Sequence, residues 1–344
     1  MKLLQVDELQ DGMLLAEDIY GRFGALYFAS GAILSEKVIK GLKKLDVQYV
    51  YVVDDVDDQE EIVIVDNKLN SEYQKTVSNF KDIFFNVKVG KKLIVNEFDD
   101  SLKSLVDEIT KSNNVLGRLR QIEMNDEYTY KHSINVSLIA TMIGKWMGFS
   151  KNELYDLAMA GLLHDIGKSR IPNEILNKPG KLTDEEYAIM KKHADYGYDI
   201  LKNTSGINEN VILGALEHHE RVDGKGYPLG LYGNRIHMYG KIIAVADVYD
   251  AMTSKRVYKN KICPFRVAEL IFQDSFGPLD PVIANTFLKN IFQFYVGNIV
   301  KLNDNQIGTV ILVNKYNPTR PLVKTPEGFI DLSQNYQYEI VDVI

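Results

Sequence analysis

The sequence predicts a multidomain, mainly α-helical protein with a small α+β domain before the helices and a small β module after them. Three observations support this prediction. The 344 residues exceed what one core usually holds, at roughly 150 residues per domain. Apolar residues in the middle of the chain recur every three or four positions, which is typical of helices. Short β-rich runs broken by turn-forming residues follow Tyr295.

Residues 1–66 are expected to form the α+β domain. Short apolar runs alternate with glycines, a helical stretch follows at 36–45, and a β-branched and aromatic run occupies 47–53. The acidic stretch 54–61 is typical of a solvated loop. We therefore expect this loop to separate the run from a second strand at 62–65.

Residues 122–296 are expected to form the main helical domain, after a helical connector at 67–121. Segments 150–153 and 183–186 have the spacing of capping boxes, in which a hydroxyl and a carboxylate satisfy free backbone N–H groups at a helix start. The β-rich runs that follow place the C-terminal β module at 297–344.

Composition restricts the class of function. With 45% hydrophobic and 25% charged residues, the chain resembles an ordinary globular protein. Its net charge of -7 argues against a nucleic-acid polymer as partner, because such binding needs a basic face. Acidic residues interrupt the first apolar run, and no stretch approaches ~18 uninterrupted apolar residues. We therefore expect a cytoplasmic protein without membrane insertion.

Cys263 is the only cysteine, which excludes an intramolecular disulfide and a cysteine-rich zinc site. Any metal must therefore be held by histidine and carboxylate side chains. All six histidines lie between residues 132 and 237. Because a single histidine is more often a hydrogen-bonded core or surface residue than a ligand, the neighbours of each histidine decide its interpretation.

The pair His164 and Asp165 is the strongest candidate for a site. It ends an apolar helical face three residues before Lys168, so two ionisable groups stand at the end of a buried helix. Burying such a pair is costly unless its charge is compensated. A divalent cation would compensate it, and a carboxylate can bridge two ions. Neighbouring side chains on a helix diverge by about 100°, so His218 and His219 favour two adjacent ions.

Two motifs follow one another in the middle of the chain. The first is HDIGK at 164–168, and the second combines HHER at 218–221 with DGKGYP at 223–228. Together they resemble the HD-GYP family of the HD phosphohydrolases, over about residues 122–296. This resemblance implies an HD-type helical catalytic domain with bound metal ions. It also implies hydrolysis of the bacterial second messenger cyclic di-GMP to the linear dinucleotide pGpG or to GMP.

The resemblance implies a set of metal-ligand positions that this sequence fills. Some family members carry a further glutamate ligand for a third ion four residues before the first histidine, where this chain has Tyr128. We therefore expect two divalent ions, iron or manganese, with Asp126 as an auxiliary group. His237 matches no ligand position and is expected to be structural. The expected ligands are His132, His164, Asp165, His193, His218, His219 and Asp247.

The resemblance also implies residues that act on the substrate. Asp165 and Lys168 are the expected catalytic residues, with Lys168 reaching a phosphate oxygen or the leaving group. Tyr227 would contact guanine or phosphate, and Asp250 would orient Lys168 or a ligand. The expected substrate-binding residues are Lys168, Tyr227, Asp250, Arg256 and Lys259.

The expected function is that of a cyclic di-GMP phosphodiesterase. Two metal ions roughly 3.5 to 4 Å apart would supply hydroxide near neutral pH and neutralise phosphoryl oxygens. Two alternatives stay open: a hydrolase of another cyclic dinucleotide, such as cyclic GMP-AMP, and a non-catalytic protein that senses a dinucleotide or scaffolds a partner. For the terminal modules, regulation or formation of a homodimer is a family-level expectation.

Overall fold

The structure is a computed structural model of the 344-residue chain. It divides into two compact units, residues 69–294 and a second unit that combines residues 1–68 with 295–344. The residues that the structure describes are 2–16, 19–20, 26–28, 32–45, 47–52, 56–111, 128–254, 262–314 and 317–343.

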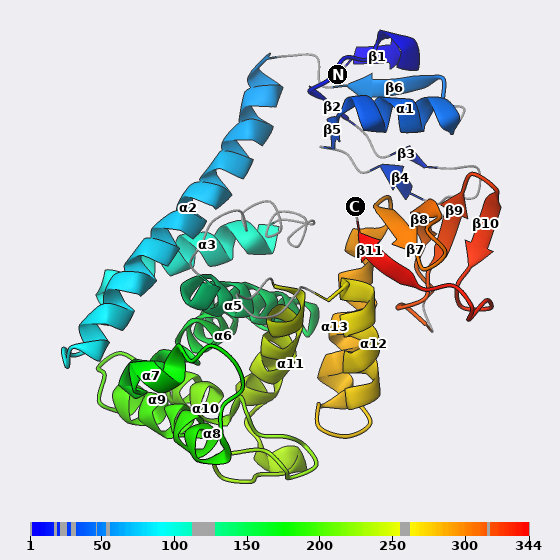
Figure 1. The fold of residues 1–344 in the computed structure, drawn as a ribbon. Helices are drawn as coiled ribbons and strands as arrows, with labels where there is room; N and C mark the ends of the chain where they lie inside the picture. The colour runs from blue at the N-terminus through cyan, green and yellow to red at the C-terminus, as the bar shows by residue number, and fades with distance from the viewer. Residues whose placement is uncertain are drawn as a thin grey trace. The chain divides into compact units, whose positions relative to one another are not determined.

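Helices build the unit of residues 69–294, which combines the connector and the helical domain expected from the sequence (Figure 1). Single-turn 3-10 helices lie at Val95–Glu97, Ile166–Arg170, Gly233–Arg235 and Phe292–Tyr295. The described α-helices are α2 Val56–Lys88, α3 Asp99–Lys111, α5 Tyr128–Trp146, α6 Lys151–Leu163, α7 Asn173–Leu176, α8 Asp184–Lys191, α9 His193–Lys202, α10 Glu209–Glu217, α11 Met238–Thr253, α12 Pro264–Asp274 and α13 Pro281–Ile291.

Helices α5 and α6 pack closely at the centre of this unit. Residues 132–144 of α5 are all buried, as expected for a helix that others surround. The two backbones approach so closely that a β-carbon at Gly161 of α6 would stand 2.7 Å from the Cα of Ser137 on α5. The Ser137 hydroxyl donates to the Ala158 carbonyl at 2.6 Å across the same contact. This packing brings the C-terminal end of α6 next to the side chains of α5.

Both capping boxes mark helix starts, as predicted. The Ser150 hydroxyl accepts from the Glu153 N–H, and the Glu153 carboxylate accepts from the Ser150 N–H. Thr183 and Glu186 make the same reciprocal pair at the start of α8. The prediction of a multidomain, mainly helical protein with sheet regions at both ends is confirmed.

The strand expected at 62–65 is wrong, because these residues lie inside helix α2. Residues 56–61, expected to be part of an acidic loop, are helical as well, whereas 54–55 lie outside the described residues. Local β propensity is a weak preference, and a longer helical pattern overrides it. That pattern is the buried face of α2, formed by Leu69, Tyr73, Val77, Phe80, Phe84 and Val87.

The first part of the second unit contains short strands and one helix. Helix α1, Glu36–Lys44, begins at Ser35, whose hydroxyl accepts from the Val38 N–H. Antiparallel pairs join β1 with β6, β2 with β5, and β3 with β4. The elements besides α1 are β1 Lys2–Gln5, a 3-10 helix at Val6–Glu8, β2 Met13–Leu14, β3 Ile19–Tyr20, β4 Leu26–Phe28, β5 Ile33–Leu34 and β6 Tyr49–Val52.

The last part of the chain forms a five-stranded antiparallel sheet in the order β10-β9-β8-β7-β11. Its strands are β7 Ile299–Leu302, β8 Ile307–Leu312, β9 Leu322–Thr325, β10 Gly328–Asp331 and β11 Ile340–Val343. These strands agree with the C-terminal β module predicted at 297–344. None of the described helices is long and apolar enough to span a membrane.

Candidate metal centre

Three buried histidines each follow the end of a helix. His164 follows α6, His193 follows α8, and His218 follows α10. The last four carbonyls of a helix have no partner inside that helix. Each histidine uses one of these carbonyls: its Nδ1 lies 2.7 Å from the carbonyl oxygen three residues earlier. Because a carbonyl only accepts, Nδ1 carries the hydrogen and the Nε2 lone pair is left for a metal.

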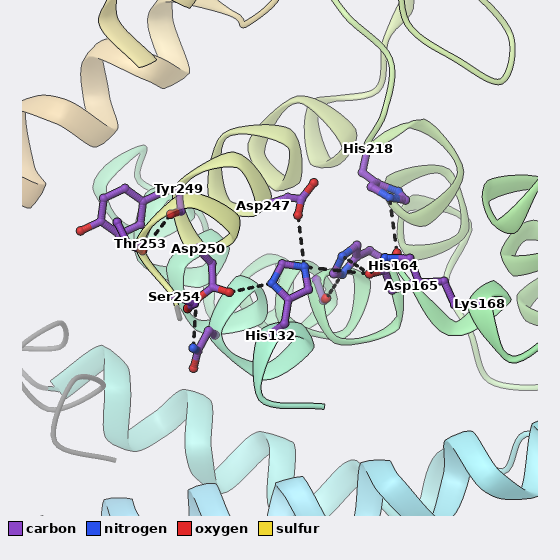
Figure 2. A network of polar contacts seen from close by, with 12 residues as sticks. His132, His164, Asp165, Lys168, His218, Asp247, Tyr249, Asp250, Thr253 and Ser254 are labelled. Carbon is purple, nitrogen blue, oxygen red and sulfur yellow. Dashed lines mark hydrogen bonds and ion pairs between the residues drawn. The ribbon is translucent and has the colours of Figure 1, made fainter. Parts of the chain in front are cut away.

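A fourth histidine, His132, comes from the interior of helix α5. Its Nδ1 lies 2.6 Å from a carboxylate oxygen of Asp250, so Nδ1 donates and Nε2 faces the other histidines (Figure 2). The Nε2 atom is 3.2 Å from a carboxylate oxygen of Asp247, one helical turn before Asp250 on α11. Helix α11 thus supplies one carboxylate to each nitrogen of this ring.

Asp165 lies between the four Nε2 atoms. Its Oδ2 is 3.2 Å from His164 Nε2 and 3.9 Å from His132 Nε2. Its Oδ1 is 3.4 Å from His193 Nε2 and 4.0 Å from His218 Nε2. Oδ1 is buried without a hydrogen-bond partner in the described structure, a costly state for a carboxylate oxygen unless a cation binds it.

The donor atoms form two groups that share this carboxylate. Asp165 with His193, His218 and His219 makes one group, and Asp165 with His132 and His164 makes the other. Within each group the donor atoms lie within 4.8 Å of one another. Nitrogen and carboxylate donors of this kind fit divalent transition metals, so the residues fit the metal centre that the sequence predicts.

Electrostatics prepares most of these side chains for a cation, which requires neutral imidazole and ionised carboxylate. Burial lowers the pKa of His193 to about 4 and holds the pKa of His218 and His219 well below the usual value. Burial raises the pKa of Asp165, but His164 and Lys168 lower it more and hold it well below its ordinary value.

His132 differs from the other histidines in its charge. Burial lowers its pKa, but hydrogen bonds to Asp247 and Asp250 outweigh burial and raise it to about 9. The proton on His132 therefore balances the carboxylates of Asp247 and Asp250. A cation at Nε2 would take over this role, because it also carries positive charge between the carboxylates.

Lys168 lies beside the shared carboxylate. The 3-10 helix at Ile166–Arg170 places its Nζ 2.5 Å from Asp165 Oδ2, and 24% of the side chain stays exposed. The expected catalytic pair is therefore brought together. The ammonium group is both close to the metal ligands and open to a ligand from solvent.

Tyr227 lies at the rim of the metal centre. We call Tyr227, Lys191 and Tyr187 together the aromatic column. The Tyr227 ring stacks on His219 with a centroid distance of 4.6 Å and an interplanar angle of 27°. The Nζ of Lys191 stands 5.9 Å from the Tyr227 ring centroid and 5.3 Å from that of Tyr187, which is exposed. Aromatic faces attract cations in this geometry. The ammonium of Lys191 thus lies within cation-π distance of both rings.

Glu220 holds the loop that carries Tyr227. Its buried carboxylate accepts three backbone N–H groups, from Leu229 at 2.6 Å, Gly230 at 3.0 Å and Leu231 at 2.9 Å. A β-carbon at Gly226 would stand 2.4 Å from the backbone of Glu220, so the loop crosses that residue at close range.

Asp250 lies behind the ligand His132, as one of its expected roles requires, and not at a surface where it could bind substrate. It is 3% exposed, and its two oxygens are engaged by His132, Asn135 and Ser254. The side chain orients a ligand and does not face solvent. His237 is structural, as expected, because its Nδ1 accepts from the Tyr239 N–H at the start of α11.

Three of the expected site residues, Asp126, Arg256 and Lys259, lie outside the described residues, and so does the side chain of Tyr128. Sequence reasoning missed four others: Tyr73, Asn135, Lys191 and Glu220. The sequence did contain a signal for Asn135. It stands three residues after His132, a spacing that puts the two side chains on one helix face. Asp247 and Asp250 have the same spacing. Tyr73 carried no such signal.

A family model described as the HD domain matches residues 116–277. These residues are an HD domain. The HD domain includes all seven expected ligand positions, Lys168 and the aromatic column. The part of the resemblance that concerned an HD-type helical domain is therefore confirmed.

Two curated relatives are similar to large parts of this chain. The chain is 34% identical over 270 residues to "Cyclic di-GMP phosphodiesterase PA4108" of Pseudomonas aeruginosa, covering 75% of this chain and 64% of that protein. It is 35% identical over 175 residues to "3'3'-cGAMP-specific phosphodiesterase 1" of Vibrio cholerae, covering 51% of this chain and 40% of that protein. The chain therefore spans less than two thirds of either relative.

A solved structure shares the fold. It is described as an HDG"Y"P protein from Bdellovibrio bacteriovorus, with a TM-score of 0.54 and 17% sequence identity. The match covers 83% of this chain and 97% of that chain. At this identity the likeness concerns the fold alone.

Proposed function

We propose that this chain is a metal-dependent phosphodiesterase that hydrolyses cyclic di-GMP to pGpG, to GMP or to both. One observation carries the proposal: two groups of donor atoms share Asp165, and Lys168 lies beside that carboxylate. A site that would hold two cations beside the partly exposed ammonium of Lys168 suits a phosphodiester, because the phosphate is anionic and gains charge on its oxygens as the bond breaks.

The chain's own residues would hold the reactants. Asp165 would bridge two divalent ions, with His193, His218 and His219 on one side and His132, His164 and Asp247 on the other. When bound, the ions supply a water molecule of lowered pKa and positive charge against the phosphoryl oxygens. Iron or manganese fits the donor set. Hydrolysis places the hydroxyl of water on phosphorus and its proton on the leaving ribose oxygen.

Lys168 would contact the phosphate that is cleaved. Its ammonium lies next to the shared carboxylate and is partly exposed, so an oxygen of the phosphodiester can replace part of its contact with Asp165. Tyr227, whose ring stacks on His219, would border the substrate. We also propose that Arg256 and Lys259 bind substrate phosphates, because arginine grips a phosphodiester through two parallel hydrogen bonds.

A second candidate is hydrolysis of a different cyclic dinucleotide. The 35% identity to a 3'3'-cGAMP-specific phosphodiesterase favours this candidate over a smaller part of the chain. The metal centre would serve both substrates, because its residues contact phosphate and not the base. Turnover of cyclic di-GMP and 3'3'-cGAMP, measured side by side on one preparation, separates the two candidates.

The decisive experiment combines metal analysis with product identification. The protein is purified without oxygen, its iron and manganese contents are measured, and the products formed from cyclic di-GMP are separated by chromatography. Asp165→Ala should lose metal and activity together, whereas Asp199→Ala, at an exposed carboxylate on α9, should keep both. A metal-loaded protein that leaves cyclic dinucleotides intact would contradict the proposal and favour a sensor or scaffold.

A further inference from the structure

A chain of buried hydrogen bonds leads from helix α2 to the metal centre. The Tyr73 hydroxyl on α2 donates to the Asn135 side-chain oxygen on α5 at 2.9 Å. The Asn135 amide nitrogen donates to Asp250 Oδ1 on α11 at 2.9 Å, and His132 Nδ1 donates to Asp250 Oδ2 at 2.6 Å. All four side chains are at most 5% exposed, so water does not compete for these bonds.

Each bond in this chain fixes the direction of the next. An asparagine side chain has an acceptor end and a donor end that differ little in shape. The Asp250 carboxylate only accepts, so it needs the donor end of Asn135, and the acceptor end is left to the Tyr73 hydroxyl. If the amide turned round, the oxygens of Asn135 and Asp250 would face each other in a buried site. By donating to the acceptor end, Tyr73 holds Asn135 in the position and orientation that suit the carboxylate.

Asp250 passes this orientation on to His132. Its Oδ1 accepts from Asn135 and from the Ser254 hydroxyl at 3.1 Å, which fixes the carboxylate plane. Its Oδ2 is thereby aimed at His132 Nδ1, and that bond turns Nε2 toward Asp165 and Asp247. A carboxylate behind a histidine ligand also makes the imidazole a stronger donor to a metal.

We propose that Tyr73 is a positioning residue of the metal centre: through Asn135 and Asp250 it holds His132 in the orientation that binds the ion shared with His164 and Asp165. Helix α2 thus belongs to the metal centre although it contributes no ligand. The proposal rests on the metal centre of the proposed function and is independent of which dinucleotide is hydrolysed.

The test is the substitution Tyr73→Phe, which removes only the hydroxyl. Loss of an outer partner of a metal-binding histidine typically weakens metal affinity about 10- to 100-fold. We expect a change of this size in the dissociation constant of one of two manganese ions, measured by titration against a chelating dye, with the other ion unaffected. Tyr239→Phe is the matched control, because this tyrosine is also buried and its hydroxyl donates to a backbone carbonyl, that of Glu153.

A double substitution separates a positioning role from general loss of stability. If Tyr73 acts through Asp250, then Tyr73→Phe should change manganese affinity little in a chain that already carries Asp250→Asn. Full additivity of the two changes would overturn the proposal, as would a Tyr73→Phe protein that binds both ions as tightly as the unaltered chain. An unaltered chain that binds no manganese or iron would instead contradict the proposed function itself.

Discussion

Gly167 lies against His193 so closely that a β-carbon at position 167 would stand 1.9 Å from the His193 carbonyl oxygen and 2.4 Å from the Gly197 nitrogen. This contact joins the 3-10 helix that follows Asp165 to the first turn of α9. It is the closest such approach given by a glycine among the described residues. Because Gly167 has no side chain, the segment that carries Asp165 can lie directly against the segment that carries His193.

Gly167→Ala should damage the metal centre and the fold together. The new methyl group would meet backbone atoms, which cannot rotate away, so Asp165 and His193 must separate. Overpacking of this kind costs about 1–3 kcal/mol. We expect lower thermal stability and loss of bound metal, measured by calorimetry and elemental analysis. Gly197→Ala is the control across the same contact, because its β-carbon would stand 3.7 Å from its nearest neighbour and should be tolerated.

Local features of this fold, such as helix starts, could be predicted from the sequence. Where a short strand-like run lies within a longer helical pattern, the sequence did not show which of the two would form. Ser150 and Thr183 start helices as expected, because a capping box depends on residues only three apart. The strand expected at 62–65 failed because four β-branched or apolar residues have no fixed structure of their own, and the packed face further along α2 extends the helix through them.

Lys168→Met should lower kcat while metal stays bound. Methionine keeps most of the length of the side chain but removes the ammonium that would face the phosphate. Loss of one charged contact to a transition state typically lowers kcat about a hundredfold. The measurement is steady-state hydrolysis of cyclic di-GMP together with metal content. Lys225→Met is the control, because 84% of that side chain is exposed. An unchanged kcat would show that Lys168 takes no part in the reaction.

Tyr187→Ala should raise KM for a cyclic dinucleotide and leave the cleavage of bis(p-nitrophenyl) phosphate unchanged. Tyr187 is exposed, and Lys191 lies within cation-π distance of both its ring and that of Tyr227, so we expect Tyr187 to offer its ring to a base at the rim of the site. Stacking on an aromatic side chain contributes about 1–3 kcal/mol per base, so we expect KM to rise about tenfold. Tyr198→Ala is the control, since Tyr198 and Lys202 make the same cation-π pair on α9. Equal losses with both substrates would refute a role in base binding.

Glu220→Gln should loosen the loop that carries Tyr227. An amide offers one acceptor oxygen where the carboxylate offers two, so at least one of the N–H groups of Leu229, Gly230 and Leu231 loses its partner. A hydrogen bond to a charged group contributes about 1.5–3 kcal/mol. Faster amide hydrogen exchange at 229–231 is the expected result. Glu174→Gln, at an exposed residue, should not change it.

The residues of the site differ in how far the sequence could reveal them. His164 and Asp165 were identifiable because they are adjacent and interrupt an apolar face, and the family motifs added their partners. Tyr73 was not identifiable, because its bond to Asn135 spans 62 residues and depends on how two helices pack. Asp250 lies between these two cases: its spacing from Asp247 was visible in the sequence, but its burial against His132 and Asn135 was not.

Removal of the metal ions should destabilise the helical unit of residues 69–294. We expect the ions to bind only the folded chain, since the donor residues come from segments as far apart in sequence as His132 and His219. A ligand at a thousand times its dissociation constant stabilises the folded state by about 4 kcal/mol. A chelator should therefore lower the melting temperature by several degrees, and added manganese should restore it.

Asp165→Asn should already melt at the lower temperature and respond to neither reagent, because Oδ1 and Oδ2 are shared by both groups of donor atoms. Hydrogen exchange locates the effect: amides of α5 and α6 should lose protection, while those of β7 to β11, which contain none of the donor atoms, should not. Equal loss of protection in both units would show that the ions act on the fold as a whole and not at this site.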